Sequence, residues 1–79
     1  MNDQGNPYPL TELKPGDEAV VSHLDGGEHF RSKLLDMGII PGVKLRVASS
    51  WGHGPSLIEI NDVKIMVGRR MLERIFVIN

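Results

Sequence analysis

Cysteine is absent from this chain of 79 residues. Its absence excludes a disulfide framework and any metal site built on thiolates. A chain without cysteine suits a reducing compartment, so we expect the protein to be cytoplasmic. Because domains seldom fall below about 50 residues, the length allows one small domain.

Neither an excess of one charge nor a long apolar run is present. Nine Lys and Arg oppose ten Asp and Glu, and the aromatic residues are one Trp, one Tyr and two Phe. This composition argues against nucleic-acid binding, which draws on basic and aromatic side chains. No stretch approaches the roughly 20 apolar residues of a membrane span, and the opening MNDQGNPYP lacks the basic and apolar regions of an export signal. We therefore expect no direct membrane insertion, and a partner would have to recruit the protein to the inner face of the cytoplasmic membrane.

An amphipathic helix is predicted over about residues 28–37. Phe30, Leu34 and Met37 recur at helical spacing, so one face of the helix is apolar and should pack on the rest of the domain. Gly38 fits the left-handed position that ends such a helix, with the next residue folding back onto the last helical turn.

Two proline-glycine pairs predict two turns. Pro41-Gly42 suits the central positions of a type II turn, and Lys14-Pro15-Gly16-Asp17 repeats that pattern. After Pro41-Gly42, apolar residues alternate with polar or small ones, as in a half-buried strand. The segment after the first turn is rich in small and β-branched apolar residues, which also favours a strand. The residues assigned to turn and cap geometry are Gly16, Gly38, Pro41 and Gly42.

Five short strands are predicted, at residues 18–24, 43–48, 57–60, 63–67 and 75–78. Alternation places Val63 on the inward face of its strand, together with Ile65 and Val67. The pattern indicates a mainly β fold: a small, strongly bent barrel of about five strands with one α-helix inserted after the first strand. Residues 1–9 are assigned to a flexible N-terminal tail and residues 10–79 to a single domain.

The sequence offers little for catalysis. No segment matches a nucleophile elbow or a phosphate-binding glycine-rich loop, so we expect no enzymatic activity and no cofactor. The weak candidates for metal ligands are His23, His29 and His53, and no pair among them has the i, i+4 spacing of a helical metal site. His23 and His29 could converge across the turn at Asp25-Gly26-Gly27.

Apolar residues near the helix end exceed what one helix face can bury, which predicts a partner-binding surface. That surface comprises Leu35, Ile39, Ile40, Met66 and Trp51, with cations that steer the partner at Arg31, Lys33, Arg69 and Arg70. Two other interpretations stay open at this stage. The apolar residues could plug one end of the barrel, or they could mediate self-association.

Several segments together resemble one family. They are LTELKPGD at 10–17, LLDMGIIPG at 34–42, VKLRV at 43–47 and LERIFV at 72–77. In this order they are similar to FeoA, a small cytosolic accessory protein of bacterial ferrous iron uptake. The SH3-like barrel of that family also occurs as the C-terminal domain of iron-dependent repressors.

The resemblance implies an SH3-like barrel with no enzymatic activity that acts on the cytosolic region of FeoB, a membrane transporter with a GTPase domain. One alternative is a metal-binding iron carrier or sensor, in which the histidines would provide transition metal ion binding. Another is a freestanding regulatory barrel of the repressor type. Repressor barrels normally follow a DNA-binding helix-turn-helix region, which is not found in this sequence, so the accessory role is favoured.

Overall fold

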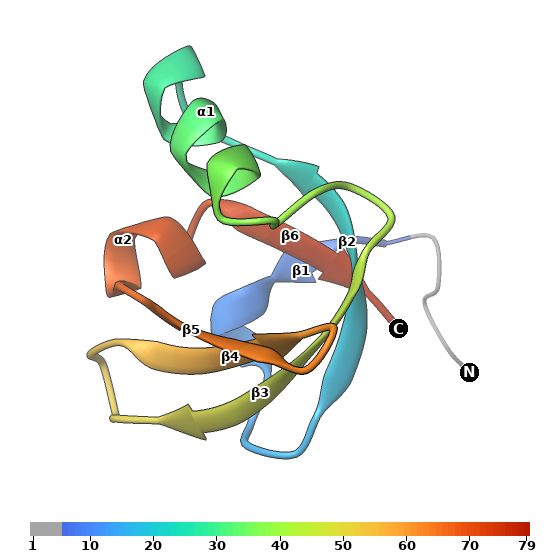
Figure 1. Cartoon of the computed structure of the whole chain (residues 1–79), viewed down its shortest axis with the longest axis vertical. Helices are drawn as coiled ribbons and strands as arrows, with labels where there is room; N and C mark the ends of the chain where they lie inside the picture. Colours follow the sequence, from blue (N-terminus) through green and yellow to red (C-terminus); the bar gives the residue numbers. More distant parts are fainter. Residues whose placement is uncertain (1–5) are drawn as a thin grey trace.

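A computed structural model describes residues 6–79, which form a mainly β fold with short helical segments (Figure 1). In chain order the elements are β1 (Tyr8–Pro9), η1 (Leu10–Glu12, a 3-10 turn), β2 (Glu18–Leu24), α1 (Glu28–Asp36), β3 (Lys44–Ser50), β4 (Ser56–Ile60), β5 (Val63–Val67), α2 (Arg69–Leu72) and β6 (Ile75–Ile78). The predicted SH3-like fold, with a helix after the first long strand, is confirmed. Within residues 6–79, no helix has the length and apolar character needed to cross a membrane.

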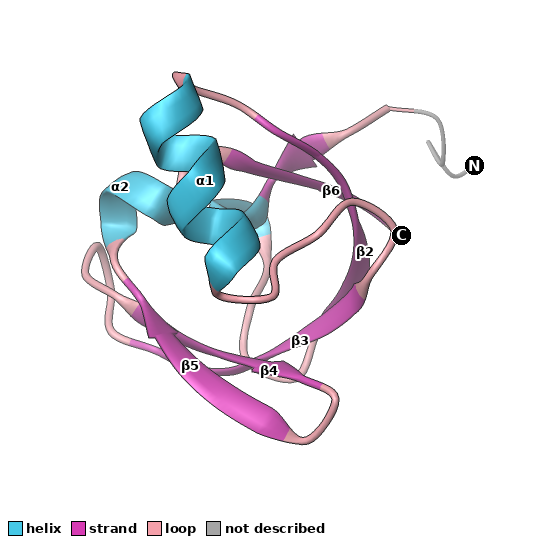
Figure 2. Ribbon diagram, turned by 45° about the horizontal axis from the view of Figure 1, so that its top comes forward, coloured by secondary structure: helices cyan, strands magenta, loops and turns pink. Residues whose placement is uncertain are grey.

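The strands of the described region form one antiparallel sheet in the order β1-β6-β2-β3-β4-β5. Its register shifts between Val21 and His23, where β2 pairs with β6, and between Val47 and Ser49, where β3 pairs with β4. Such bulges bend and twist a strand. The sheet therefore curves around the core, and α1 and α2 cover its open side (Figure 2).

β1 lies in the segment that the sequence pattern assigns to the tail. Tyr8 pairs with Val77 and Pro9 with Phe76, and the Tyr8 hydroxyl donates a hydrogen bond to the side chain of Asn79. The sheet thus begins two residues before the predicted boundary at residue 10. A strand of two residues is too short to show a periodic pattern, and proline is typical of a residue that interrupts a strand. Residues 1–5 of the predicted tail lie outside the described residues.

The first proline-glycine turn is anchored on a neighbouring strand. The amide of Asp17 donates to the carbonyl of Lys14 at 2.9 Å, which closes the turn, and Gly16 has a φ of +96°. The amide of Gly16 donates to the carbonyl of Val47 at 2.7 Å, and the amide of Val47 donates to the carbonyl of Asp17 at 3.0 Å. The turn that starts β2 is therefore fixed to β3.

The second turn has the same arrangement, with the roles of β2 and β3 exchanged. The amide of Val43 donates to the carbonyl of Ile40 at 3.0 Å, and Gly42 has a φ of +95°. The amide of Gly42 donates to the carbonyl of Val21 at 2.7 Å, and the amide of Val21 donates to Val43 at 2.9 Å. The turn that starts β3 is thus fixed to β2, and both predicted turns are present.

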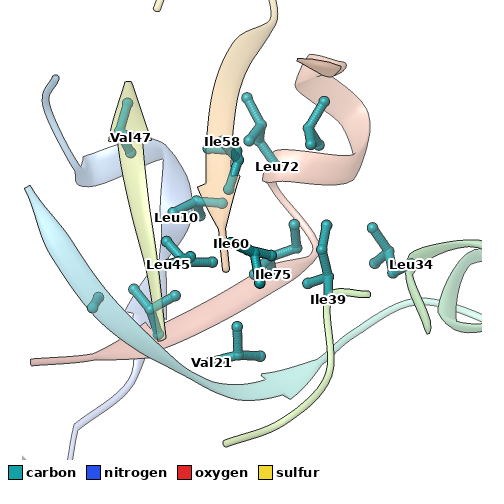
Figure 3. Packing of buried hydrophobic residues seen from close by; sticks show 13 residues of the cluster. Leu10, Val21, Leu34, Ile39, Leu45, Val47, Ile58, Ile60, Leu72 and Ile75 are labelled. Atoms are coloured by element: carbon teal, nitrogen blue, oxygen red, sulfur yellow. The ribbon is translucent and has the colours of Figure 1, made fainter. Parts of the chain in front are cut away.

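Gly38 ends α1 in a Schellman motif. Its amide donates to the carbonyl of Leu35, and the amide of Ile39 donates to the carbonyl of Leu34, both at 3.0 Å. With a φ of +87°, Gly38 occupies the left-handed region that glycine adopts without a Cβ penalty. Ile39 folds back beside Leu34, and both side chains are fully buried (Figure 3).

The core lies inside the curved sheet and beneath the helices (Figure 3). Its buried apolar residues are Leu10, Ala19, Val21, Leu34, Ile39, Leu45, Val47, Ile58, Ile60, Val67, Leu72, Ile75 and Val77. Val63 is not among them: it is exposed, and the prediction that it faces inward is wrong. Val63 pairs with Ile60 beside the hairpin tip on the edge strand β5, so the pairing places it at the margin of the sheet.

The cap at Gly38 makes a stability prediction. A Cβ at this position would meet no atom within 4 Å, so Gly38→Ala changes backbone conformational energy and creates no clash. We expect Gly38→Ala to lower the free energy of unfolding by about 1–2 kcal/mol, and Gly38→Asn to lower it less, because asparagine tolerates the left-handed region. Urea unfolding monitored by circular dichroism measures both. Equal losses for the two variants would contradict this account.

Adjacent isoleucines provide a second test. Ile39 is 0% exposed, whereas Ile40 is 50% exposed. We expect Ile39→Ala to lower the free energy of unfolding by about 2–5 kcal/mol, because it leaves a cavity. Ile40→Ala should change it by no more than about 0.5 kcal/mol. Thermal unfolding of the two variants provides the comparison. Similar midpoint temperatures would contradict the difference in burial between Ile39 and Ile40.

Candidate interaction surface

One face of α1 packs on the barrel. Leu34 is buried there, and Phe30 and Met37 are half-buried, so the predicted apolar stripe is the inward face of the helix. The remaining residues of α1 lie on the two flanks of this inward face. Side chains four positions apart in a helix are neighbours and therefore share a flank. Arg31 and Leu35 share one flank.

The predicted docking residues at the helix end are divided by burial. Leu35 is 46% exposed and Ile40 is 50% exposed. Ile39, predicted to belong to the same surface, is fully buried, so that part of the prediction is wrong. The physical reason is the Schellman motif, in which the residue after the capping glycine contacts the last helical turn.

An open cleft of about 330 Å³ lies beside Leu35. It is lined by His23, Leu24, Arg31, Leu35 and Pro41, which come from β2, α1 and the turn after α1. Ile40 directly precedes Pro41, and its side chain is exposed. We call these six residues the helix-turn surface.

The charge on this surface is cationic. Within residues 6–79, salt bridges join Lys44 to Glu18, Arg46 to Glu59, and Arg69 to Glu73. Arg31 takes part in none of these pairs and is exposed. Its guanidinium is therefore available to a partner's carboxylate at the rim of the cleft.

His23 has a packing role in this surface. Its ring stacks on that of Phe76, with centroids 4.8 Å apart and planes 3° from parallel. Its Nδ1 lies 3.3 Å from the hydroxyl of Ser22. A stacked ring at this point gives the cleft a flat, partly apolar wall.

The other predicted cations do not join Arg31. Lys33 and Arg70 line a second cleft, on the opposite flank of α1, together with His29. Arg69 forms an i, i+4 ion pair with Glu73 at 3.4 Å. The four predicted steering residues are thus spread over separate places, which helical spacing alone would have shown for Arg31 and Lys33.

Trp51 and Met66 are exposed, as predicted, but line neither cleft. Met66 pairs with Leu57 across β4 and β5, on the outward face of the sheet. Trp51 follows β3 in a tight loop, where its carbonyl accepts a hydrogen bond from the amide of Gly54 at 2.8 Å. Neither residue extends the helix-turn surface.

The candidate metal ligands lie in different surroundings. His23 stacks on Phe76, His29 lines the second cleft, and His53 is exposed in the loop after β3. In the described part of the chain, no three His, Cys, Asp or Glu side chains are placed to hold a metal ion together.

Comparison with known proteins agrees with the fold and identifies related sequences. A sequence model of the FeoA domain matches residues 8–79. A Methanocaldococcus jannaschii protein, named as a candidate Fe(2+) transport protein A, is 36% identical over 70 residues, which cover 89% of this chain and 84% of the relative.

Solved structures give the same result. The crystal structure of an iron uptake regulatory protein (FeoA) superposes with a TM-score of 0.86 at 34% identity, covering 92% of this chain and 97% of that one. A manganese-dependent transcriptional repressor has a TM-score of 0.85 at 19% identity, covering 92% of this chain and 41% of the repressor, and shares the fold alone. The match over residues 8–79 and the identity to these relatives show that this chain belongs to the FeoA family.

Proposed function

We propose that this protein is a non-enzymatic, cytoplasmic accessory protein of ferrous iron transport that binds the cytosolic region of the transporter FeoB through its helix-turn surface. Family membership supports the link to ferrous iron transport. The contact with FeoB and the surface that makes it go beyond family membership and are proposed.

One observation carries the choice of surface. Leu35 and Ile40 are large aliphatic side chains, each about half exposed, on the two sides of the Schellman turn. Leu35 lines a cleft together with the exposed cation Arg31, and Ile40 directly precedes Pro41, which also lines that cleft. Exposed apolar groups next to a cleft are typical of protein-binding sites, because burying them removes apolar area from water.

The backbone holds this surface in one arrangement. Ile40 lies between the buried Ile39 and a turn whose glycine amide is bound to β2. Little conformational freedom is lost when such a segment binds, which favours affinity. Arg31 would steer an acidic partner and raise the association rate more than the final affinity.

Recruitment to the membrane would follow from this contact. FeoB spans the membrane, so a complex with its cytosolic region would hold this protein at the inner face. A second copy of this chain is the competing occupant of the surface, since Leu35 and Ile40 could also pair across a two-fold axis.

The test uses variants of the two exposed residues. We expect Leu35→Asp with Ile40→Asp to weaken binding to the purified cytosolic domain of FeoB by at least about tenfold, because the contact would then bury two carboxylates in place of two aliphatic groups. Isothermal titration calorimetry measures the dissociation constant, and circular dichroism checks that the variant folds.

Met66→Asp is the matched control, because Met66 is 51% exposed and lies on β5, away from the helix-turn surface. It should bind FeoB as tightly as the wild type. Unchanged affinity for the double variant would overturn the proposed surface. Absence of wild-type binding, with a concentration-dependent dimer lost in the same variant, would assign the surface to self-association.

A further inference from the structure

A second cleft lies between the two helices, on the flank of α1 opposite to Arg31. Its volume is about 420 Å³, and its lining residues are His29, Phe30, Lys33, Gly68, Arg70 and Met71. Figure 2 shows α1 and α2 side by side above the open side of the sheet. We call this the interhelical cleft. Its residues come from α1 and from α2 with the preceding Gly68, which are far apart in the sequence.

The floor of the interhelical cleft is apolar and adaptable. Phe30 and Met71 are both half-buried there. The guanidinium of Arg74 lies 5.1 Å from the centroid of the Phe30 ring, and this cation-π contact holds the ring in place. Methionine is flexible and fits apolar side chains of different shapes. Such a floor can accept one large aliphatic or aromatic side chain.

The rim of the cleft is basic. His29, Lys33 and Arg70 are exposed there, and no carboxylate of residues 6–79 lines the cleft. The salt bridges within residues 6–79 use neither Lys33 nor Arg70. Two unpaired cations facing one apolar floor complement a ligand that is apolar in its centre and negative at its edges.

We propose that the interhelical cleft binds an acidic protein segment, which inserts one apolar side chain between α1 and α2 and places carboxylates against Lys33 and Arg70. An arginine can bind a carboxylate through two parallel hydrogen bonds, which makes Arg70 the stronger anchor. A nucleotide fits less well, because the lining has no glycine-rich cradle and its polar groups are confined to the rim.

This site is separate from the helix-turn surface and does not depend on it. Lys33 and Arg31 are two residues apart in α1 and therefore point to opposite flanks of the helix. They line different clefts. The two surfaces can therefore be inactivated independently by substitutions in the same helix.

The experiment uses a short fluorescein-labelled peptide of Asp, Glu and Ser with a single central Leu. Two matched peptides replace the Leu by Ser, or the acidic residues by Gln. We expect the first peptide to bind at least about tenfold more tightly than either control in fluorescence anisotropy, with affinity falling as NaCl is raised. Inorganic phosphate and GTP should not displace it at comparable concentrations.

Charge reversal then locates the site. Lys33→Glu with Arg70→Glu should weaken peptide binding by at least about tenfold, whereas Arg31→Glu should leave it unchanged. Lys33→Gln with Arg70→Gln serves as a milder pair should reversal disturb folding. Amide shifts of Gly68 and Met71 in ¹H–¹⁵N spectra should change on adding peptide.

Four results would overturn the proposal: no binding, equal binding of the Leu and Ser peptides, displacement by phosphate or GTP, or equal weakening by Arg31→Glu. None of these bears on the contact with FeoB at the helix-turn surface. Loss of that contact alone, conversely, would leave the interhelical site intact.

Discussion

Two backbone hydrogen bonds, one from each proline-glycine turn, hold the central strand pair of the sheet. Gly16 donates to Val47 on β3, and Gly42 donates to Val21 on β2. The glycine amide takes no part in the hydrogen bond that closes such a turn, so it is available to a neighbouring strand. The two bonds fix the register of β2 against β3, and β6 and β4 then pair with their outer edges.

The same constraint determines what the protein exposes. Only a few residues separate the end of α1 from the start of β3, and both sides of that connection are fixed: Gly38 caps the helix, and Gly42 binds the sheet. Between them, Ile39 is drawn into the core and Ile40 is left in solvent. The position of Ile40 relative to the barrel thus follows from the two fixed ends of this connection.

Local patterns in the sequence predicted the features that neighbouring residues determine. The bounds of β2, β5 and β6 follow from short runs rich in β-branched and apolar residues, and the conformations of Gly38 and Gly42 follow from their neighbours in the chain. Contacts between distant segments were not predictable. β1 exists only because Tyr8 and Pro9 meet the other end of the chain, and the interhelical cleft requires α2 to lie beside α1. Ile39 and Ile40 are chemically identical, and it is the cap at Gly38, a local motif, that separates the buried residue from the exposed one.

The nine residues of α1 combine folding and recognition on different faces. Leu34 anchors the inward face, Arg31 and Leu35 form one flank, and His29 and Lys33 form the other. Arg31 and Leu35 share their cleft with β2 and the turn after α1, whereas His29 and Lys33 share theirs with α2. Side chains two positions apart in a helix point to opposite sides, so one short helix can offer two separate surfaces while its inward face stays in the core.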